Sequence, residues 1–294
     1  METIPAKTLL TRKKDSSWFG TEYNLNLYRG CCHGCIYCDS RSDCYHIEDF
    51  SRVRAKADAL RILRDELQRK VRSGVVATGS MSDPYNPFEG TELLTRHALE
   101  LLDAFSFGVA IATKGTLITR DIDLLGSIRE HSPVLCKITL TTDDDALAKR
   151  IEPASPSPTQ RLEAIAALAQ AGIPVGVLLM PVLPWITDGR EQLLSLLGRI
   201  KEAGGRFVYC YPGVTLRAGQ REYFYAQLDR SFPGLRARYE SRYGERYSCT
   251  VSGAKGYWDL FSRTCDQLGL FYEMKDIISW YQMGYGSSQL SFFS

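Results

Sequence analysis

The chain has 294 residues, of which 44% are hydrophobic and 24% charged, with a formal net charge of +2 and a pI near 8.0. These values are typical of a globular protein with one large domain or a core plus an appendage, and they exclude disordered, collagen-like and disulfide-held small proteins. No apolar run approaches the ~20 residues that a membrane span needs, and the polar N-terminus does not resemble a signal peptide. We therefore expect a cytoplasmic protein without membrane contact.

Short apolar runs alternate with amphipathic segments between residues 20 and 212. Their periodicity predicts strands at residues 23–29, 74–78, 107–113, 134–141, 173–180 and 206–210. Helices are expected at residues 55–73, 93–105, 120–130, 157–171 and 189–203. Six such βα repeats predict an α/β fold with a parallel sheet, too short for an eight-stranded barrel and therefore a partial barrel or a doubly wound sheet. In either arrangement the active site lies at the carboxyl ends of the strands.

The composition changes after Pro212, which predicts a core of residues 1–212 and a helical extension of residues 213–294. Helices are expected in the extension at residues 218–229, 233–243 and 257–268. Residues 206–247 carry eight arginines with interleaved aromatic side chains. Arginine and aromatic side chains together favour phosphate contact and base stacking, so nucleic acid is a candidate partner. The alternative is a solvated helix surface above an aromatic core.

Five of the nine cysteines fall within residues 31–44, which indicates a metal site in a reducing compartment. Cys31, Cys35 and Cys38 have the spacing C-x3-C-x2-C. A structural zinc ion needs four ligands, and His33 or Cys44 would have to supply the fourth. The remaining cysteines, including Cys210, Cys249 and Cys265, lack the close spacing that an auxiliary cluster usually has.

A [4Fe–4S] cluster takes one cysteine per iron, so three cysteines leave one iron open. An open iron binds a small molecule through an amine and a carboxylate, and S-adenosylmethionine carries both. Such a cofactor supplies the difficult chemistry, while the protein orients it and excludes water.

The motif, the aromatic Tyr37 before its last cysteine and the βα series that follows resemble the radical S-adenosylmethionine superfamily. The resemblance implies that Cys31, Cys35 and Cys38 ligate the cluster and that Tyr37 lies near the adenine of the cofactor. It leaves Cys32 without a role.

Over roughly residues 7–210 the chain resembles the spore photoproduct lyase-like family in several segments: Asn26-Leu27-Tyr28-Arg29-Gly30-Cys31, Gly79 to Pro87, Thr113-Lys114, Arg120 to Leu125, Ile151-Glu152-Pro153 and Gly172 to Gly176. This resemblance implies a partial (β/α)6 barrel with an N-terminal cysteine loop. It also implies that Ser80, Ser82 and Asp83 contact the methionyl part of the cofactor. Lys114 and the hydroxyl of Thr139 or Thr141 would approach its carboxylate and ribose.

The lyase that names this family repairs a thymine dimer and uses a cysteine hydrogen donor before a Thr-Ser-Asp sequence. Ser80, before Met81-Ser82-Asp83, occupies the matching position here, and a hydroxyl is a far worse hydrogen-atom donor than a thiol. Cys136, Tyr223 and Tyr225 are weak candidates for a hydrogen donor or relay. Core packing is the competing interpretation for Cys136, whose position falls in a strand.

We therefore expect an enzyme that reductively cleaves S-adenosylmethionine to a 5′-deoxyadenosyl radical, which abstracts hydrogen from an unknown substrate, with a flavodoxin or ferredoxin as electron donor. The alternatives are a DNA-lesion lyase, a metal-containing nucleic-acid-binding module without radical chemistry, and an electron-transfer or cluster-carrier protein. The substrate, the fate of the cofactor and the oligomeric state do not follow from the sequence.

Overall fold

The computed structural model describes residues 1–70 and 72–285, and within these residues the main sheet has the strand order β10-β9-β8-β7-β6-β3-β2. All neighbouring strands from β3 to β10 pair in parallel, and β2 pairs antiparallel with β3 at one edge. The strands are β2 (Leu10–Arg12), β3 (Tyr23–Leu25), β6 (Val75–Thr78), β7 (Gly108–Thr113), β8 (Val134–Thr139), β9 (Val175–Leu179) and β10 (Val208–Cys210). The predicted partial barrel of six parallel strands is confirmed.

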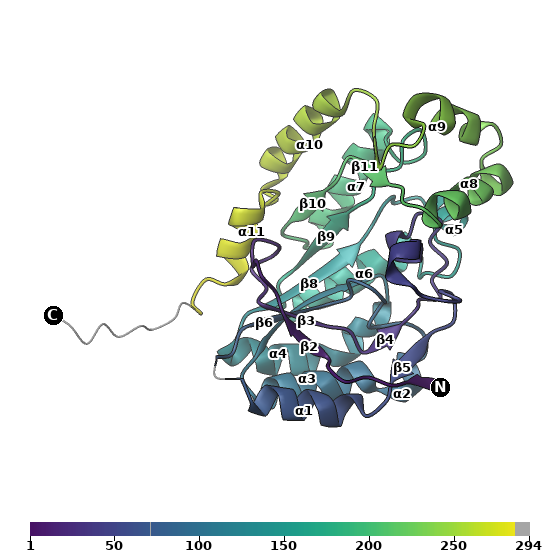
Figure 1. Ribbon diagram of the computed structural model, residues 1–294. Coiled ribbons are helices and arrows are strands. Elements are labelled where there is room, and N and C mark those ends of the chain that lie inside the picture. Colours follow the sequence, from purple (N-terminus) through teal and green to yellow (C-terminus); the bar gives the residue numbers. More distant parts are fainter. Residues whose placement is uncertain (71, 286–294) are drawn as a thin grey trace.

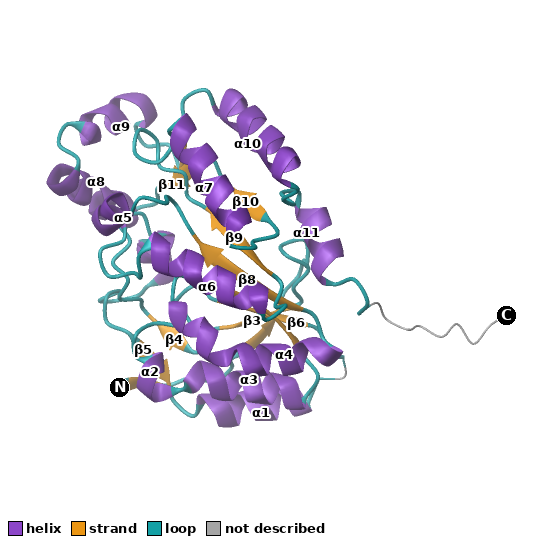
Figure 2. Ribbon diagram, turned by 180° about the vertical axis from the view of Figure 1, so that it is seen from behind, coloured by secondary structure: helices purple, strands orange, loops and turns teal. Residues whose placement is uncertain are grey.

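Helices cover the outer face of this sheet, as Figure 2 shows from behind. They are α1 (Ala59–Gln68), α3 (Leu94–Ala104), α4 (Ile122–His131), α6 (Pro158–Gln170) and α7 (Arg190–Glu202). The short helices α2 (Glu89–Glu92) and α5 (Asp145–Ile151) lie in the connections after β6 and β8. The start of α6 follows from its sequence, because Ser157 and Gln160 form a capping box around Pro158 in the first turn. The short helix α5, capped by Asp144, did not emerge from the sequence pattern.

Two expected elements around the cysteine loop have different limits. The strand expected at residues 23–29 is divided into β3 and β4 (Tyr28–Arg29), and β4 joins a small separate sheet with β1 (Thr3–Ile4) and β5 (Arg54–Lys56). The helix expected at residues 55–73 begins only at Ala59, because β5 occupies the preceding residues. The small sheet therefore supports the segment that leads into the cysteine loop.

The C-terminal extension has two parts (Figure 1). The first contains β11 (Gly213–Thr215), α8 (Gln220–Ser231), α9 (Leu235–Tyr243) and β12 (Ser248–Thr250), and its apolar cluster includes Cys35, Ile36 and Tyr37 of the cysteine loop. The second contains α10 (Ala254–Leu268), which packs against α7, and α11 (Met274–Tyr281), whose Ile277 and Tyr281 join the cluster inside the sheet. The extension is thus packed against both the cysteine loop and the core.

Among the described residues, no helix is both long and apolar enough to cross a membrane.

Candidate cofactor and substrate cavity

The cysteine loop begins immediately after β4, at Gly30. This glycine has φ +81°, and a Cβ atom there would lie 2.4 Å from the carbonyl oxygen of Arg52. Only glycine fits such a position without strain. The backbone N–H of Cys31 then donates to the carbonyl of Phe50 at 2.8 Å, which fixes the first cysteine of the motif.

A cavity of about 340 Å³ opens at the carboxyl ends of β6, β7, β8 and β9. The three motif cysteines line it from the cysteine loop. Its other lining residues include five that the sequence predicted as cofactor-binding: Ser80, Ser82, Asp83, Lys114 and Thr139. The structure therefore brings the predicted cluster ligands and most of the predicted cofactor-binding residues to one cavity.

The loop after β6 turns sharply to reach this cavity. Gly79 has φ +90°, and a Cβ atom there would lie 1.8 Å from the carbonyl oxygen of Ala112 on β7. The close approach of the two backbones explains why glycine stands at the start of the Ser80–Asp83 segment.

Asp83 is a buried carboxylate that organises the cavity wall. Its Oδ2 atom lies 3.0 Å from His33 Nε2 and accepts the backbone N–H of Lys114 at 2.7 Å. Its Oδ1 atom accepts the hydroxyl of Thr113 and the backbone N–H of Tyr85 at 2.9 Å. Burial would raise the pKa of Asp83, but His33 and these donors hold it well below the usual value. One carboxylate therefore joins the cysteine loop to the ends of β6 and β7.

Glu152 has the same role on the other side of the cysteine loop. This buried carboxylate accepts the hydroxyls of Tyr37 and, at 3.1 Å, Thr141, and it forms an ion pair with buried Arg161. Arg161 also donates to the carbonyl of Thr139 at 2.9 Å. Burial would raise the pKa of Glu152, but Arg161 and Lys114 lower it. The pair fastens the cysteine loop to the end of β8 and to α6.

Lys114 lies between these two carboxylate groups. Its ammonium is 5.5 Å from the ring centroid of Tyr37, within range of a cation–π contact. Burial lowers the pKa of Lys114, but the negative charges of Cys35 and Glu152 raise it above its ordinary value. Lys114 is thus a retained cation at the cavity wall, suited to a ligand carboxylate.

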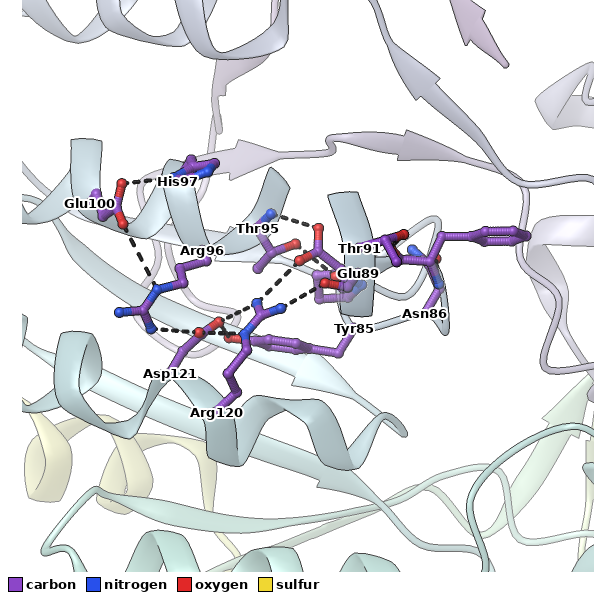
Figure 3. Close-up of polar contacts among 12 residues, drawn as sticks. Tyr85, Asn86, Glu89, Thr91, Thr95, Arg96, His97, Glu100, Arg120 and Asp121 are labelled. Atoms are coloured by element: carbon purple, nitrogen blue, oxygen red, sulfur yellow. Dashed lines mark hydrogen bonds and ion pairs between the residues drawn. The ribbon is translucent and has the colours of Figure 1, made fainter. Parts of the chain in front are cut away.

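Behind the cavity wall, a network of charged groups holds the segment that follows Asp83 (Figure 3). The hydroxyl of Tyr85 donates to Asp121 at 3.0 Å, and Asp121 also accepts from Arg96 and Arg120 at 2.9 and 2.8 Å. Arg120 further donates to the carbonyl of Glu89 at 2.6 Å. Through this network the Arg-Asp-Ile-Asp segment at residues 120–123 anchors the Asp-Pro-Tyr-Asn-Pro segment at residues 83–87.

Other predicted site residues lie outside the cavity. Tyr37 and Thr141 are not among its lining residues and instead bind Glu152 behind the wall. Cys136 is fully buried on the helix-facing side of β8, within the main apolar core, so its thiol does not reach the cavity. Tyr225 packs in the cluster of the extension, and Tyr223 lies 4.2 Å from the guanidinium of Arg41. The structure therefore supplies no contact with the cavity for the three proposed hydrogen donors.

The cysteines outside the motif are also dispersed. Cys44 is exposed, Cys249 is buried in the cluster of the extension, and Cys210 and Cys265 are buried in the main core. These four cysteines lie in different parts of the fold, so the structure does not bring them together as ligands of an auxiliary cluster.

The sequence interpretation missed several residues of the site. His33 was considered only as a zinc ligand, and its contact with Asp83 is a different role. Glu152 belongs to a segment of resemblance for which the sequence predicts no role, and the sequence does not single out its partner Arg161. Lys137, Asn24 and Trp18 also line the cavity. Lys137 could have been identified from the sequence, because it is a charged residue within the apolar run of residues 134–141.

Comparison with known proteins agrees with this geometry. Residues 25–197 match the model of the radical SAM superfamily, and the chain belongs to this superfamily. It is 35% identical over 247 residues to an uncharacterized protein of Mycobacterium tuberculosis, which covers 82% of this chain and 72% of the relative. An uncharacterized protein of Methanocaldococcus jannaschii is 31% identical over 214 residues, which covers 73% of this chain and 78% of that protein.

Solved structures show the same fold. A spore photoproduct lyase complexed with a dinucleoside spore photoproduct superposes with a TM-score of 0.65 at 17% identity, covering 92% of this chain and 80% of the lyase. The radical S-adenosylmethionine methyltransferase TsrM from Kitasatospora setae, with tryptophan and a cofactor analogue bound, has a TM-score of 0.54 at 10% identity, covering 83% and 51%.

Proposed function

We propose that this protein is a radical S-adenosylmethionine enzyme whose Cys31, Cys35 and Cys38 hold a [4Fe–4S] cluster. The observation that carries the proposal is the single cavity that these three cysteines share with Asp83, Lys114 and the Ser80–Ser82 segment. A cubane cluster binds each thiolate to a different iron, so its ligands are arranged around it rather than converging on one ion. All three motif cysteines line the cavity, which supports their assignment as the ligands.

A cluster held by Cys31, Cys35 and Cys38, with S-adenosylmethionine beside it, would supply one-electron reductive cleavage of the sulfonium and so a radical able to remove a hydrogen atom from a substrate C–H bond. The protein contributes positioning and charge. Lys114 offers its ammonium to the carboxylate of the cofactor, and Asp83 fixes the backbone of Lys114 and the His33 side chain beside the cysteine loop. Ser82 and Thr139 also line the cavity, and the Ser82 hydroxyl donates to the carbonyl of Tyr28 at 2.9 Å, which leaves its oxygen as an acceptor.

Burial raises the pKa of Cys35 to about 11, with Lys114 acting in the opposite direction. Cluster assembly must therefore displace protons, because thiolates and not thiols ligate iron. We further propose that a flavodoxin or ferredoxin delivers the electron, since the reaction consumes one electron for each cofactor cleaved.

The test is anaerobic reconstitution with iron and sulfide, followed by reduction with dithionite in the presence of S-adenosylmethionine. We expect a reduced [4Fe–4S] signal in the electron paramagnetic resonance spectrum that changes when the cofactor is added, together with 5′-deoxyadenosine. Cys35→Ala should abolish both signals, whereas Cys44→Ala, at an exposed cysteine outside the cavity, should retain them. A cluster signal that does not change when S-adenosylmethionine is added, without formation of 5′-deoxyadenosine, would overturn the proposal.

The transformation of the substrate is a separate question. Among the described residues, the cysteines that line the cavity are the three proposed cluster ligands. A thiol hydrogen donor of the kind used in lesion repair is therefore lacking at Ser80, which favours a reaction other than spore photoproduct repair.

A further inference from the structure

Lys137 is a buried cation on the central strand β8. Its exposed fraction is 3%, and it lines the inner part of the cavity. Among the described residues, no carboxylate lies within ion-pair distance of its ammonium, and no acceptor forms a hydrogen bond with it. Its contact is with an aromatic ring, because Lys137 Nζ lies 4.6 Å from the centroid of Phe19.

The alternation of side chains along β8 sets the direction of the Lys137 side chain. Side chains alternate along a strand, so Leu135, Lys137 and Thr139 share the inner face of β8, while Cys136 belongs to the core beneath the helices. Thr139 is at the end of β8, and Lys137 lies one pleat deeper. Its neighbours in the sheet are Ala112 on β7 and Gly176 on β9, and the ring of Phe207 packs over Gly176.

The inner end of the cavity is also electrostatically unbalanced. Burial lowers the pKa of Lys137 to about 7, and the charge of nearby Lys13 adds to this effect. Lys13 is close to Asp15 and Glu22, whose charges oppose the lowering of its own pKa, and it donates to Thr21 at 2.8 Å. Lys137 lacks such compensation, unlike buried Arg161 with Glu152. The Lys137 ammonium is not among the enclosed polar atoms that lack a partner, so it faces the cavity. A cavity lysine with a strongly perturbed pKa and no carboxylate partner is a common mark of a functional site.

We propose that Lys137 binds an anionic group of the substrate, a carboxylate or a phosphate, at the inner end of the cavity. This inference rests on the proposed function, because it assigns the outer end of the same cavity to the cluster and S-adenosylmethionine. An anion on Lys137 holds the substrate one pleat below Thr139 and so presents its remaining atoms toward the cofactor. The enzyme then acts on a small acid or a phosphate ester whose charged group is fixed by β8.

The test is competitive acetylation of lysines with trace acetic anhydride, read by mass spectrometry on the reconstituted holoenzyme at pH 7. Separate samples contain sodium phosphate, sodium succinate or sodium chloride at equal ionic strength, and exposed Lys149 provides the internal reference. We expect at least fivefold slower acetylation of Lys137 with phosphate or succinate, and no change at Lys149. Protection by phosphate alone identifies a phosphate ester, and protection by succinate alone identifies a carboxylic acid. Equal labelling in all three salts, or no labelling of Lys137 in chloride, would overturn the inference.

Variants add a second readout. Calorimetric titration with the protecting anion should give a dissociation constant at least tenfold higher for Lys137→Gln, and a smaller increase for Lys137→Arg, which keeps the charge. Lys149→Gln should match the wild type. An unchanged dissociation constant in Lys137→Gln contradicts the assignment.

The two proposals fail separately. Wild-type protein that yields 5′-deoxyadenosine but shows no protection of Lys137 retains the proposed function and loses the anion site. Protein that shows protection without 5′-deoxyadenosine retains the anion site and loses the radical chemistry.

Discussion

Replacing Lys137 by methionine should stabilise the protein without its ligands. The pKa of Lys137 falls from 10.5 to about 7 on folding. Since one pKa unit corresponds to about 1.4 kcal/mol, burial of this amine costs about 4 kcal/mol at pH 7. The contact with Phe19 returns about 1 kcal/mol. Methionine keeps the volume of the side chain, so Lys137→Met should raise the free energy of unfolding by about 3 kcal/mol.

The pH dependence of this gain has a definite sign. Between pH 7 and 10.5 the unfolded chain holds a proton on Lys137 that the folded chain has lost, so the burial cost falls as pH rises through this window. The cost is full below pH 7, is about 2 kcal/mol at pH 9 and vanishes near pH 10.5. The advantage of Lys137→Met over wild type should therefore shrink between pH 7 and pH 9.

Urea denaturation at pH 7 and pH 9, followed by circular dichroism, measures both effects. Leu135→Met provides the matched control, because Leu135 is fully buried on the same face of β8 and carries no charge. It should lower the free energy of unfolding by less than about 1.5 kcal/mol at either pH. A destabilised Lys137→Met, or a gain that does not depend on pH, would refute the reasoning that Lys137 is an uncompensated cation.

Three further predictions concern the rest of the cavity. Arg161→Met leaves Glu152 buried without its cation and should lower the free energy of unfolding, measured in urea, by about 3–5 kcal/mol. The control Arg61→Met removes an exposed ion pair and should change this free energy by less than about 1 kcal/mol, and equal losses in the two variants would contradict the role of the buried pair. The pKa of Asp83 is depressed, so its contribution to stability is present above pH ~4 and is lost as pH falls from there toward the folded-state value. Asp83→Asn should therefore flatten the dependence of the free energy of unfolding on pH between about pH 4 and 2, and an unaltered dependence would count against this role. Because Ser80 offers a hydroxyl and not a thiol, the reconstituted wild type should form 5′-deoxyadenosine without converting a dinucleoside spore photoproduct, as followed by liquid chromatography, and conversion would place the chain among the lesion lyases.

The order of strands and helices was predictable because each apolar run is a buried strand with a helix after it. The predicted ends of strands and helices were less accurate where pairing with another segment overrides the periodicity of the sequence. Residues 23–29 form an unbroken strand pattern, yet β3 and β4 belong to different sheets, because β4 pairs with the distant β5. Such a division depends on contacts between segments far apart in the chain, which periodicity does not encode.

The same distinction applies to the site. The family resemblance singled out Asp83 and Lys114, and their places after predicted strands agree with it, since the carboxyl ends of parallel strands meet at one edge of the sheet. The partners of these residues were not predictable: Tyr37 and Glu152 are 115 residues apart and become neighbours only when the cysteine loop reaches the end of β8. A resemblance of short segments identified which residues matter, but not which of them bind one another.

The charged groups around the cavity fall into two kinds, and the difference separates scaffold from function. Asp83 and Glu152 are buried with several donors each, so the folded chain satisfies them without a ligand. Their motifs are explained by the need to hold the cysteine loop and the strand ends in one arrangement. Lys137 is equally buried, but the described part of the chain gives it only an aromatic face. In our proposal an anion bound at Lys137 compensates this charge and recovers part of the free energy that its burial costs. The chemistry that selects the substrate is therefore to be sought at the inner end of the cavity, on β8, rather than in the cysteine loop.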